Sequence, residues 1–167
     1  MLGLKRKYIS SKHFPKILFL GWLEEYKGIK EILAAINTLK KRNYKFHISI
    51  AGDGSCRNYI KNYVSKNNLD KYITLTGWVD ETEKIKLLEE SNIFLLPSWN
   101  EGLPNSLIEA LSAGLACIVS KVGMIPDFVK DKENCLLISP KNVHDIVLSL
   151  EKLFTDLEVR QKIAKNG

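Results

Sequence analysis

The chain has 167 residues, 45% of them hydrophobic and 26% charged, which suits one globular domain with a sizeable core. No apolar run approaches the roughly 20 residues that span a bilayer, and the basic N-terminus lacks the apolar segment of a signal peptide. Three scattered cysteines without C-x-x-C spacing are typical of reduced thiols in a cytosolic protein, and indicate neither a metal site nor a disulfide framework.

The formal net charge of +6 admits three interpretations. Nucleic-acid binding would favour basic residues interleaved with aromatic ones, and no such motif occurs, so we expect no nucleic-acid partner. A solvated surface accounts for the charge. Attraction to an anionic membrane face is a third interpretation, in which the protein is peripheral to the membrane.

Residues 1–15 are predicted to form an N-terminal tail or linker, and residues 16–167 a single domain. Buried strands are expected at 17–21, 46–51, 72–75, 93–96, 116–119 and 136–138. Helices are expected through 29–39, 59–64, 80–88, 104–114, 143–154 and 159–164, and a loop or short helix at 123–129. The alternation predicts an α/β fold, a doubly wound, Rossmann-like parallel sheet of about six strands with helices on both faces.

The stretch 91–114 joins a strand to a helix through a loop of small and polar residues. The run 93–96 is short and uncharged, as in a strand buried on both faces, and Pro97 stops it. A helix starts near Pro104, and Gly114 is expected to close it as a left-handed cap. Ligands bind at this edge of open parallel sheets, and a helix N-terminus there attracts phosphate.

Two carboxylates frame this turn, Glu101 in the loop and Glu109 in the helix, with seven residues between them. A carboxylate accepts hydrogen bonds from vicinal hydroxyls, so the pair suggests a sugar or a ribose on either side of a bound phosphate. The alternative is a loop acid and a solvated helix acid without a ligand.

The segment EGLPNSLIE, followed by ALSAG, resembles the Glu-x7-Glu motif of the retaining "group 1" nucleotide-sugar glycosyltransferases. The resemblance extends from about Lys16 to the C-terminus, and implies the C-terminal, donor-binding half of a GT-B fold. It implies that Glu109 holds ribose hydroxyls and that Glu101, as the catalytic residue, holds those of the donor sugar. It also implies that the donor diphosphate lies against Lys27 and the backbone at Gly102, Leu103, Pro104 and Asn105.

The family pattern after the first strand is glycine-arginine, then lysine-glycine, with the two cations on the donor diphosphate. Gly21, Lys27 and Gly28 match this pattern, and Trp22 stands where the arginine is expected. The substitution removes one positive charge and predicts weakened donor binding. Taken alone, the segment favours a glycine turn and a surface lysine.

The segment Gly77-Trp78-Val79 resembles the family loop that holds the nucleotide base. Trp78 would stack on the base and Val79 would contact it. The alternative is that Trp78 covers the edge of the sheet.

The resemblance implies transfer of a sugar from a UDP- or GDP-type donor to a glycan or lipid-linked acceptor. No Asp-x-Asp motif occurs, so no metal or other cofactor is expected. The acceptor-binding domain would be supplied in cis or in trans, and the chain alone is expected to be inactive. Alternatives are a non-catalytic sugar-nucleotide-binding subunit of a split enzyme, an epimerase, or a phosphorylase. The expected location is cytoplasmic, at the inner face of the membrane or free of it.

Overall fold

A computed structural model describes residues 14–167, which form a six-stranded, all-parallel sheet in the order β3-β2-β1-β4-β5-β6. The predicted tail or linker at 1–15 lies outside the described residues except at its last two positions, and stays a prediction. The strands are β1 (Lys16–Leu20), β2 (His47–Ala51), β3 (Ile73–Gly77), β4 (Ile93–Leu96), β5 (Ala116–Ser120) and β6 (Leu136–Ile138). The doubly wound sheet is confirmed.

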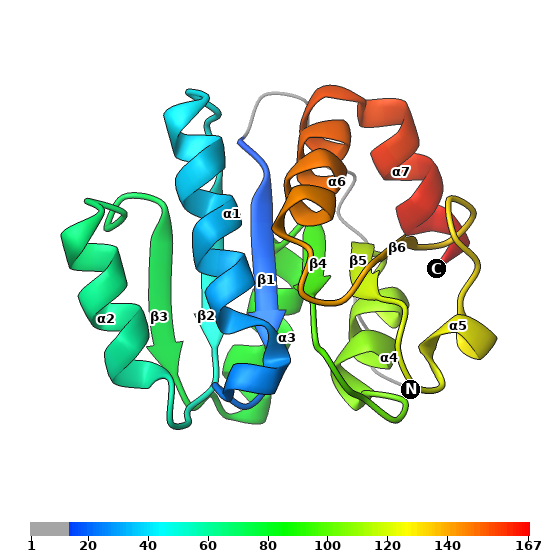
Figure 1. The fold of residues 1–167 in the computed structure, drawn as a ribbon. Helices are drawn as coiled ribbons and strands as arrows, with labels where there is room; N and C mark the ends of the chain where they lie inside the picture. The colour runs from blue at the N-terminus through cyan, green and yellow to red at the C-terminus, as the bar shows by residue number, and fades with distance from the viewer. Residues whose placement is uncertain (1–13) are drawn as a thin grey trace.

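Helices cover both faces of the sheet, as the alternating sequence predicts. Figure 1 shows α1 and α6 in front of the sheet and α3 and α4 behind it, with all strands ending at the lower edge. The helices are η1 (Glu25–Lys27), α1 (Ile29–Lys41), α2 (Arg57–Lys66), α3 (Glu81–Glu90), α4 (Asn105–Ser112), α5 (Ile125–Phe128), α6 (Val143–Thr155) and α7 (Leu157–Asn166).

Three features expected from the sequence are present in the structure: a buried strand, a helix N-terminal cap and a glycine that ends a helix. All four residues of β4 are buried, and Phe94 lies in the core with Phe19 of the neighbouring strand β1. Asp80 and Glu83 form a capping box at the start of α3. Gly114 adopts φ +73° after α4, and the N–H groups at 114 and 115 close the helix by bonding to earlier carbonyls.

Most element boundaries shift by one or two residues from the prediction; the third strand and the unpredicted turn η1 show why. The third strand starts at Ile73 and runs on to Gly77, because its pairing with β2 continues until Gly77 lies opposite Ala51. Apolar residues alone placed its end at Leu75, since the later threonine is polar and exposed. The turn of 3-10 helix η1, with only three residues, is too short to produce a periodic signal.

All three cysteines, at 56, 117 and 135, are free and buried. Burial raises the pKa of Cys135 to about 12, so this thiol stays protonated at neutral pH and acts as a packing group. Among the described residues, no helix has both the length and the apolar character needed to cross a membrane.

Gly28 joins η1 to α1 and presses against the end of β4. Its φ is +75°, and a Cβ atom built there would lie 2.2 Å from the carbonyl oxygen of Pro97. Only glycine combines that backbone conformation with so close an approach. The connection after β1 and the loop after β4 are therefore fixed against each other at this point.

Replacing Gly28 by alanine should lower the free energy of unfolding by at least about 2 kcal/mol, because the side chain would add left-handed strain and a backbone overlap. Gly102→Ala is the matched control, since a Cβ there has no heavy-atom neighbour within 4 Å. The control should change stability by less than about 1 kcal/mol. Urea denaturation of both variants measures the difference, and equal losses would contradict the packing described.

Candidate functional site

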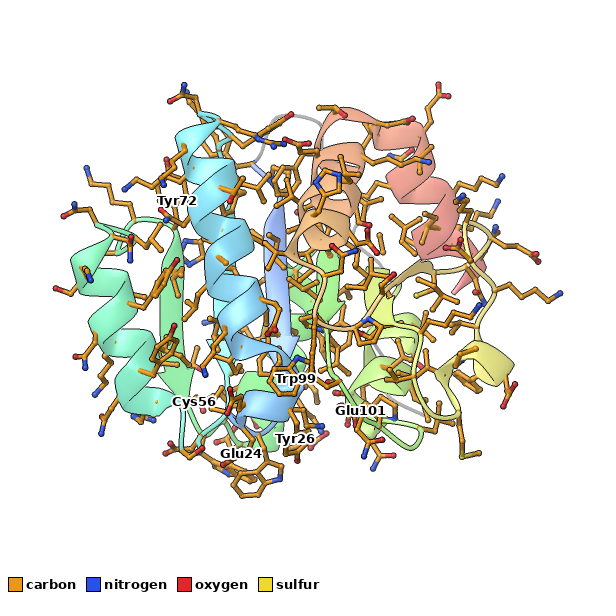
Figure 2. The ribbon with its side chains drawn as sticks, viewed as in Figure 1. Glu24, Tyr26, Cys56, Tyr72, Trp99 and Glu101 are labelled. Carbon is orange, nitrogen blue, oxygen red and sulfur yellow. The ribbon has the colours of Figure 1, made fainter. Side chains whose placement is uncertain are left out.

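The candidate site lies where the strand order reverses. Strands β1 and β4 are neighbours, but the chain runs outward from β1 through β2 to β3 before crossing back to β4. The helices that follow these two strands, α1 and α4, lie on opposite faces of the sheet, and in open parallel sheets ligands bind at the carboxyl ends of the strands at such a switch point. Figure 2 shows Glu24, Tyr26, Trp99 and Glu101 along this edge, whereas Tyr72 lies at the opposite one.

An ion pair crosses this switch point. The Lys27 Nζ atom, at the end of η1, lies 2.7 Å from Glu101 Oε1, in the loop after β4. Their side chains are only 13% and 9% exposed. The buried Ser98 hydroxyl donates a second hydrogen bond, of 2.7 Å, to the same carboxylate oxygen. The structure thus brings together two residues that lie 74 positions apart and that the sequence assigned to one site.

Backbone contacts hold the two loops in this arrangement. Gly28 packs on Pro97, and the Trp99 N–H donates a 2.7 Å hydrogen bond to the Tyr26 carbonyl. On the other side, the Met124 N–H donates to the Gly102 carbonyl at 3.3 Å. The loop that carries Glu101 is therefore supported from both β1 and β5, and its carboxylate is preorganised.

Glu109 has a different lysine partner. Lys84, on α3, lies 2.8 Å from Glu109 Oε1 and 2.8 Å from Glu81 Oε2. Hydrogen bonds to Glu109 and then to Glu81 raise the pKa of Lys84, so this side chain is charged throughout the neutral range. The lysine and Glu109 are mostly covered, at 19% and 24% exposed.

The N-terminus of α4 lies between the two carboxylates and presents backbone donors. Its N-cap is Pro104, and no side chain in the part of the chain that the structure describes caps it, in contrast to α3 with its Asp80 cap. The first N–H groups of a helix have no partner within the helix, and the dipole is positive there. The predicted residues Gly102, Leu103, Pro104 and Asn105 all lie in this turn.

Two exposed tryptophans meet beside the end of β2. Trp22 follows Gly21 at the end of β1, and Trp78 follows β3; their ring centroids are 5.5 Å apart at an interplanar angle of 48°. They are 56% and 69% exposed. Val79 is half-buried between Trp78 and the start of α3. The structure thus pairs the residue that replaces the family arginine with the residue expected to stack on a base.

The site combines two carboxylates that can accept hydrogen bonds from hydroxyls, the backbone N–H donors of a helix start, two lysines and an aromatic surface. Carboxylates accept from vicinal hydroxyls, while a lysine and a helix N-terminus bind phosphate. Among residues 14–167, no group of three or more His, Cys, Asp and Glu side chains is placed to hold a metal ion. The arrangement is suited to a ligand with hydroxyls on both sides of an anionic group.

Lys84 and Ser98 were not among the residues predicted from the sequence. Lys84 lies 25 residues before Glu109 and shares no motif with it, so only the packing of α3 beside α4 brings the two together. Ser98 follows Pro97 in a polar loop, where a serine is ordinary. Its complete burial, which singles it out, depends on the tertiary structure.

The profile of the family described as "Glycosyl transferases group 1" matches residues 4–167. The C-terminal domain of the group 1 family protein LpcC from Francisella tularensis superposes with a TM-score of 0.81 at 29% identity, covering 92% of this chain and 83% of that one.

Two full-length relatives are longer than this chain. An uncharacterized glycosyltransferase of Methanocaldococcus jannaschii is 28% identical over 152 residues, which cover 90% of this chain and 38% of the relative. An Escherichia coli protein, UDP-Gal:alpha-D-GlcNAc-diphosphoundecaprenol alpha-1,3-galactosyltransferase, is 36% identical over 118 residues, which cover 70% of this chain and 30% of the relative. The chain thus spans about a third of the length of these relatives. The chain belongs to the group 1 glycosyl transferases, and it has the fold of one Rossmann-like half of a GT-B enzyme.

Proposed function

We propose that this chain is the donor-binding domain of a retaining glycosyltransferase that uses a nucleotide-diphospho-sugar. One observation carries the proposal: Glu101 and Glu109 flank the N-terminus of α4, which no side chain among residues 14–167 caps, and each carboxylate is paired with a lysine from another element. Carboxylates that accept hydrogen bonds from hydroxyls, on both sides of a helix N-terminus that can bind phosphate, match a ligand with a ribose, a diphosphate and a sugar.

The roles follow from the chemistry of each group. Glu109 accepts hydrogen bonds from the ribose hydroxyls, and Glu101 accepts them from the donor sugar. Lys27 and the N–H groups near Asn105 bind the diphosphate, and Gly21 lets the backbone approach the ligand. Trp78 and Val79, in the loop after β3, contact the nucleobase.

The chemical step breaks the bond between the anomeric carbon and the diphosphate oxygen. Negative charge grows on the departing diphosphate, and preorganised donors aimed at that charge lower the barrier. Lys27 and the first turn of α4 supply those donors. No divalent ion is required by this proposal. The acceptor hydroxyl attacks the anomeric carbon from the face that the diphosphate leaves and gives its proton to the departing diphosphate, so the anomeric configuration is retained.

The acceptor is proposed to be a glycan or a lipid-linked sugar. The E. coli relative is named for a diphosphoundecaprenol-linked substrate, and the net charge of +6 suits a cytoplasmic protein that associates with an anionic membrane face. A GT-B enzyme closes its site between two domains, so an acceptor-binding domain is proposed to join this one in cis or in trans.

The 167-residue chain alone should therefore bind donors and transfer no sugar. The measurement is release of UDP or GDP from radiolabelled sugar nucleotides in the presence of polyprenyl-diphosphate-linked sugars. A control tube with an intact GT-B transferase verifies the assay. Steady turnover by the purified chain would contradict the need for a second domain.

Glu109→Gln should weaken binding of both UDP or GDP and the corresponding sugar nucleotide by roughly 1–3 kcal/mol, because the ribose loses a charged acceptor in each. Glu90→Gln is the matched control, since Glu90 also pairs with a lysine, Lys16, at 3.5 Å, but at the amino end of β1. Calorimetric titration should show no change in the control. If wild type binds neither nucleotide, the proposed function is wrong.

Trp22→Arg should tighten nucleoside diphosphate binding about three- to tenfold, because it restores the cation expected at this position and permits a bidentate phosphate contact. Tyr59→Arg is the control: it adds the same charge at an exposed aromatic on α2. The titration compares UDP with uridine, or GDP with guanosine. A gain of similar size in the control would show that net charge, not position, is responsible.

A further inference from the structure

The Lys27–Glu101 pair places two groups with different proposed ligands in direct contact. Lys27 is the cation for the diphosphate, yet its Nζ atom is 2.7 Å from the carboxylate proposed for the sugar. Both side chains are nearly covered, and Ser98 is the other donor to the same Glu101 oxygen. Screening by solvent is weak at such a site, so the charge of Glu101 is felt by whatever approaches Lys27.

The negative charge of Glu101 opposes binding of a free nucleoside diphosphate at Lys27. Lys27 has three N–H donors but a single charge, and Glu101 already balances it. The incoming diphosphate must share the lysine with a carboxylate held beside it. The backbone donors of α4 offset only part of this repulsion, because a helix dipole amounts to about half a charge.

A sugar attached to the diphosphate lowers the electrostatic cost of binding beside Glu101 in two ways. It removes roughly one negative charge from the diphosphate, whose terminal phosphate otherwise ionises a second time near neutral pH. Its hydroxyls also donate hydrogen bonds to Glu101, which satisfies the carboxylate while Lys27 turns to the phosphate. Only the intact donor therefore supplies a replacement partner to both members of the pair.

We propose that Glu101 is a specificity-determining residue that, through its pair with Lys27, rejects free nucleoside diphosphate and admits the sugar nucleotide. This inference rests on the donor-binding function proposed above. After transfer, the product diphosphate no longer offers hydroxyls to Glu101, the ion pair re-forms, and the product is expelled. The same contact thus discriminates against the product and promotes its release.

Glu109 provides the internal comparison. Its partner Lys84, which is shared with Glu81, belongs to α3, whereas Lys27 belongs to η1. The ribose that Glu109 is proposed to hold is present in substrate and product alike. Loss of its charge should therefore weaken both ligands to the same degree and leave the ratio of their affinities unchanged.

The test is calorimetric titration of UDP and UDP-galactose, and of GDP and GDP-mannose, into wild type, Glu101→Gln and Glu109→Gln. Glutamine keeps the shape of the side chain and an acceptor for Lys27 and Ser98, so the fold should persist, as a thermal melt verifies. Glu101→Gln should tighten the nucleoside diphosphate about three- to tenfold, because the charge of Lys27 is then no longer balanced by a carboxylate, and it should not tighten the sugar nucleotide.

The outcomes separate the inference from the function on which it rests. Unchanged or weaker diphosphate binding by Glu101→Gln, with wild type binding both ligands, overturns the inference and leaves the donor-binding function intact. Equal tightening of both ligands also overturns it, because the sugar would then make no difference. A wild-type protein that binds none of the four nucleotides overturns the proposed function itself.

Discussion

The buried ion pair between Lys27 and Glu101 is the interaction around which the carboxyl edge of the sheet is arranged. Removing two charges from water is costly, and such a pair seldom stabilises a protein more than apolar packing would. Here the side chains are held by a serine hydroxyl, a glycine packed on Pro97 and a backbone hydrogen bond between Trp99 and Tyr26. The donor-binding role proposed for Lys27 and Glu101 would account for so much support around a contact of small net stability.

The site as a whole is close to electrically balanced. Glu101 forms an ion pair with Lys27, and Glu109 forms one with Lys84. Lys84 forms a second ion pair, with Glu81, so two lysines face three carboxylates. Little free positive charge is therefore left among these groups for a diphosphate, and the arginine that would add it is replaced by Trp22. The exposed Trp22–Trp78 pair offers stacking surface in its place. A ligand would gain more from hydroxyl and aromatic contacts here than from charge.

The extent of the chain relative to its family has a physical consequence. It spans about a third of the length of its full-length relatives but covers 83% of an isolated C-terminal domain from Francisella tularensis. The described residues contain a continuous core over all six strands, with Phe19 and Phe94 at its centre. The donor-binding proposal therefore concerns a unit with its own hydrophobic core.

The sequence by itself determined the order and type of nearly every element, because buried strands, amphipathic helices and caps such as Asp80 are encoded by neighbouring residues. It also determined the candidate motif, because Glu101, Glu109 and the turn between them lie within one strand–loop–helix unit. The tertiary structure alone decided which groups touch. Lys27 with Glu101, Lys84 with Glu109, and Trp22 with Trp78 come from different connections of the sheet. Local spacing carries no information on contacts between segments that only the strand order brings together, so these partners could be found only in the folded chain.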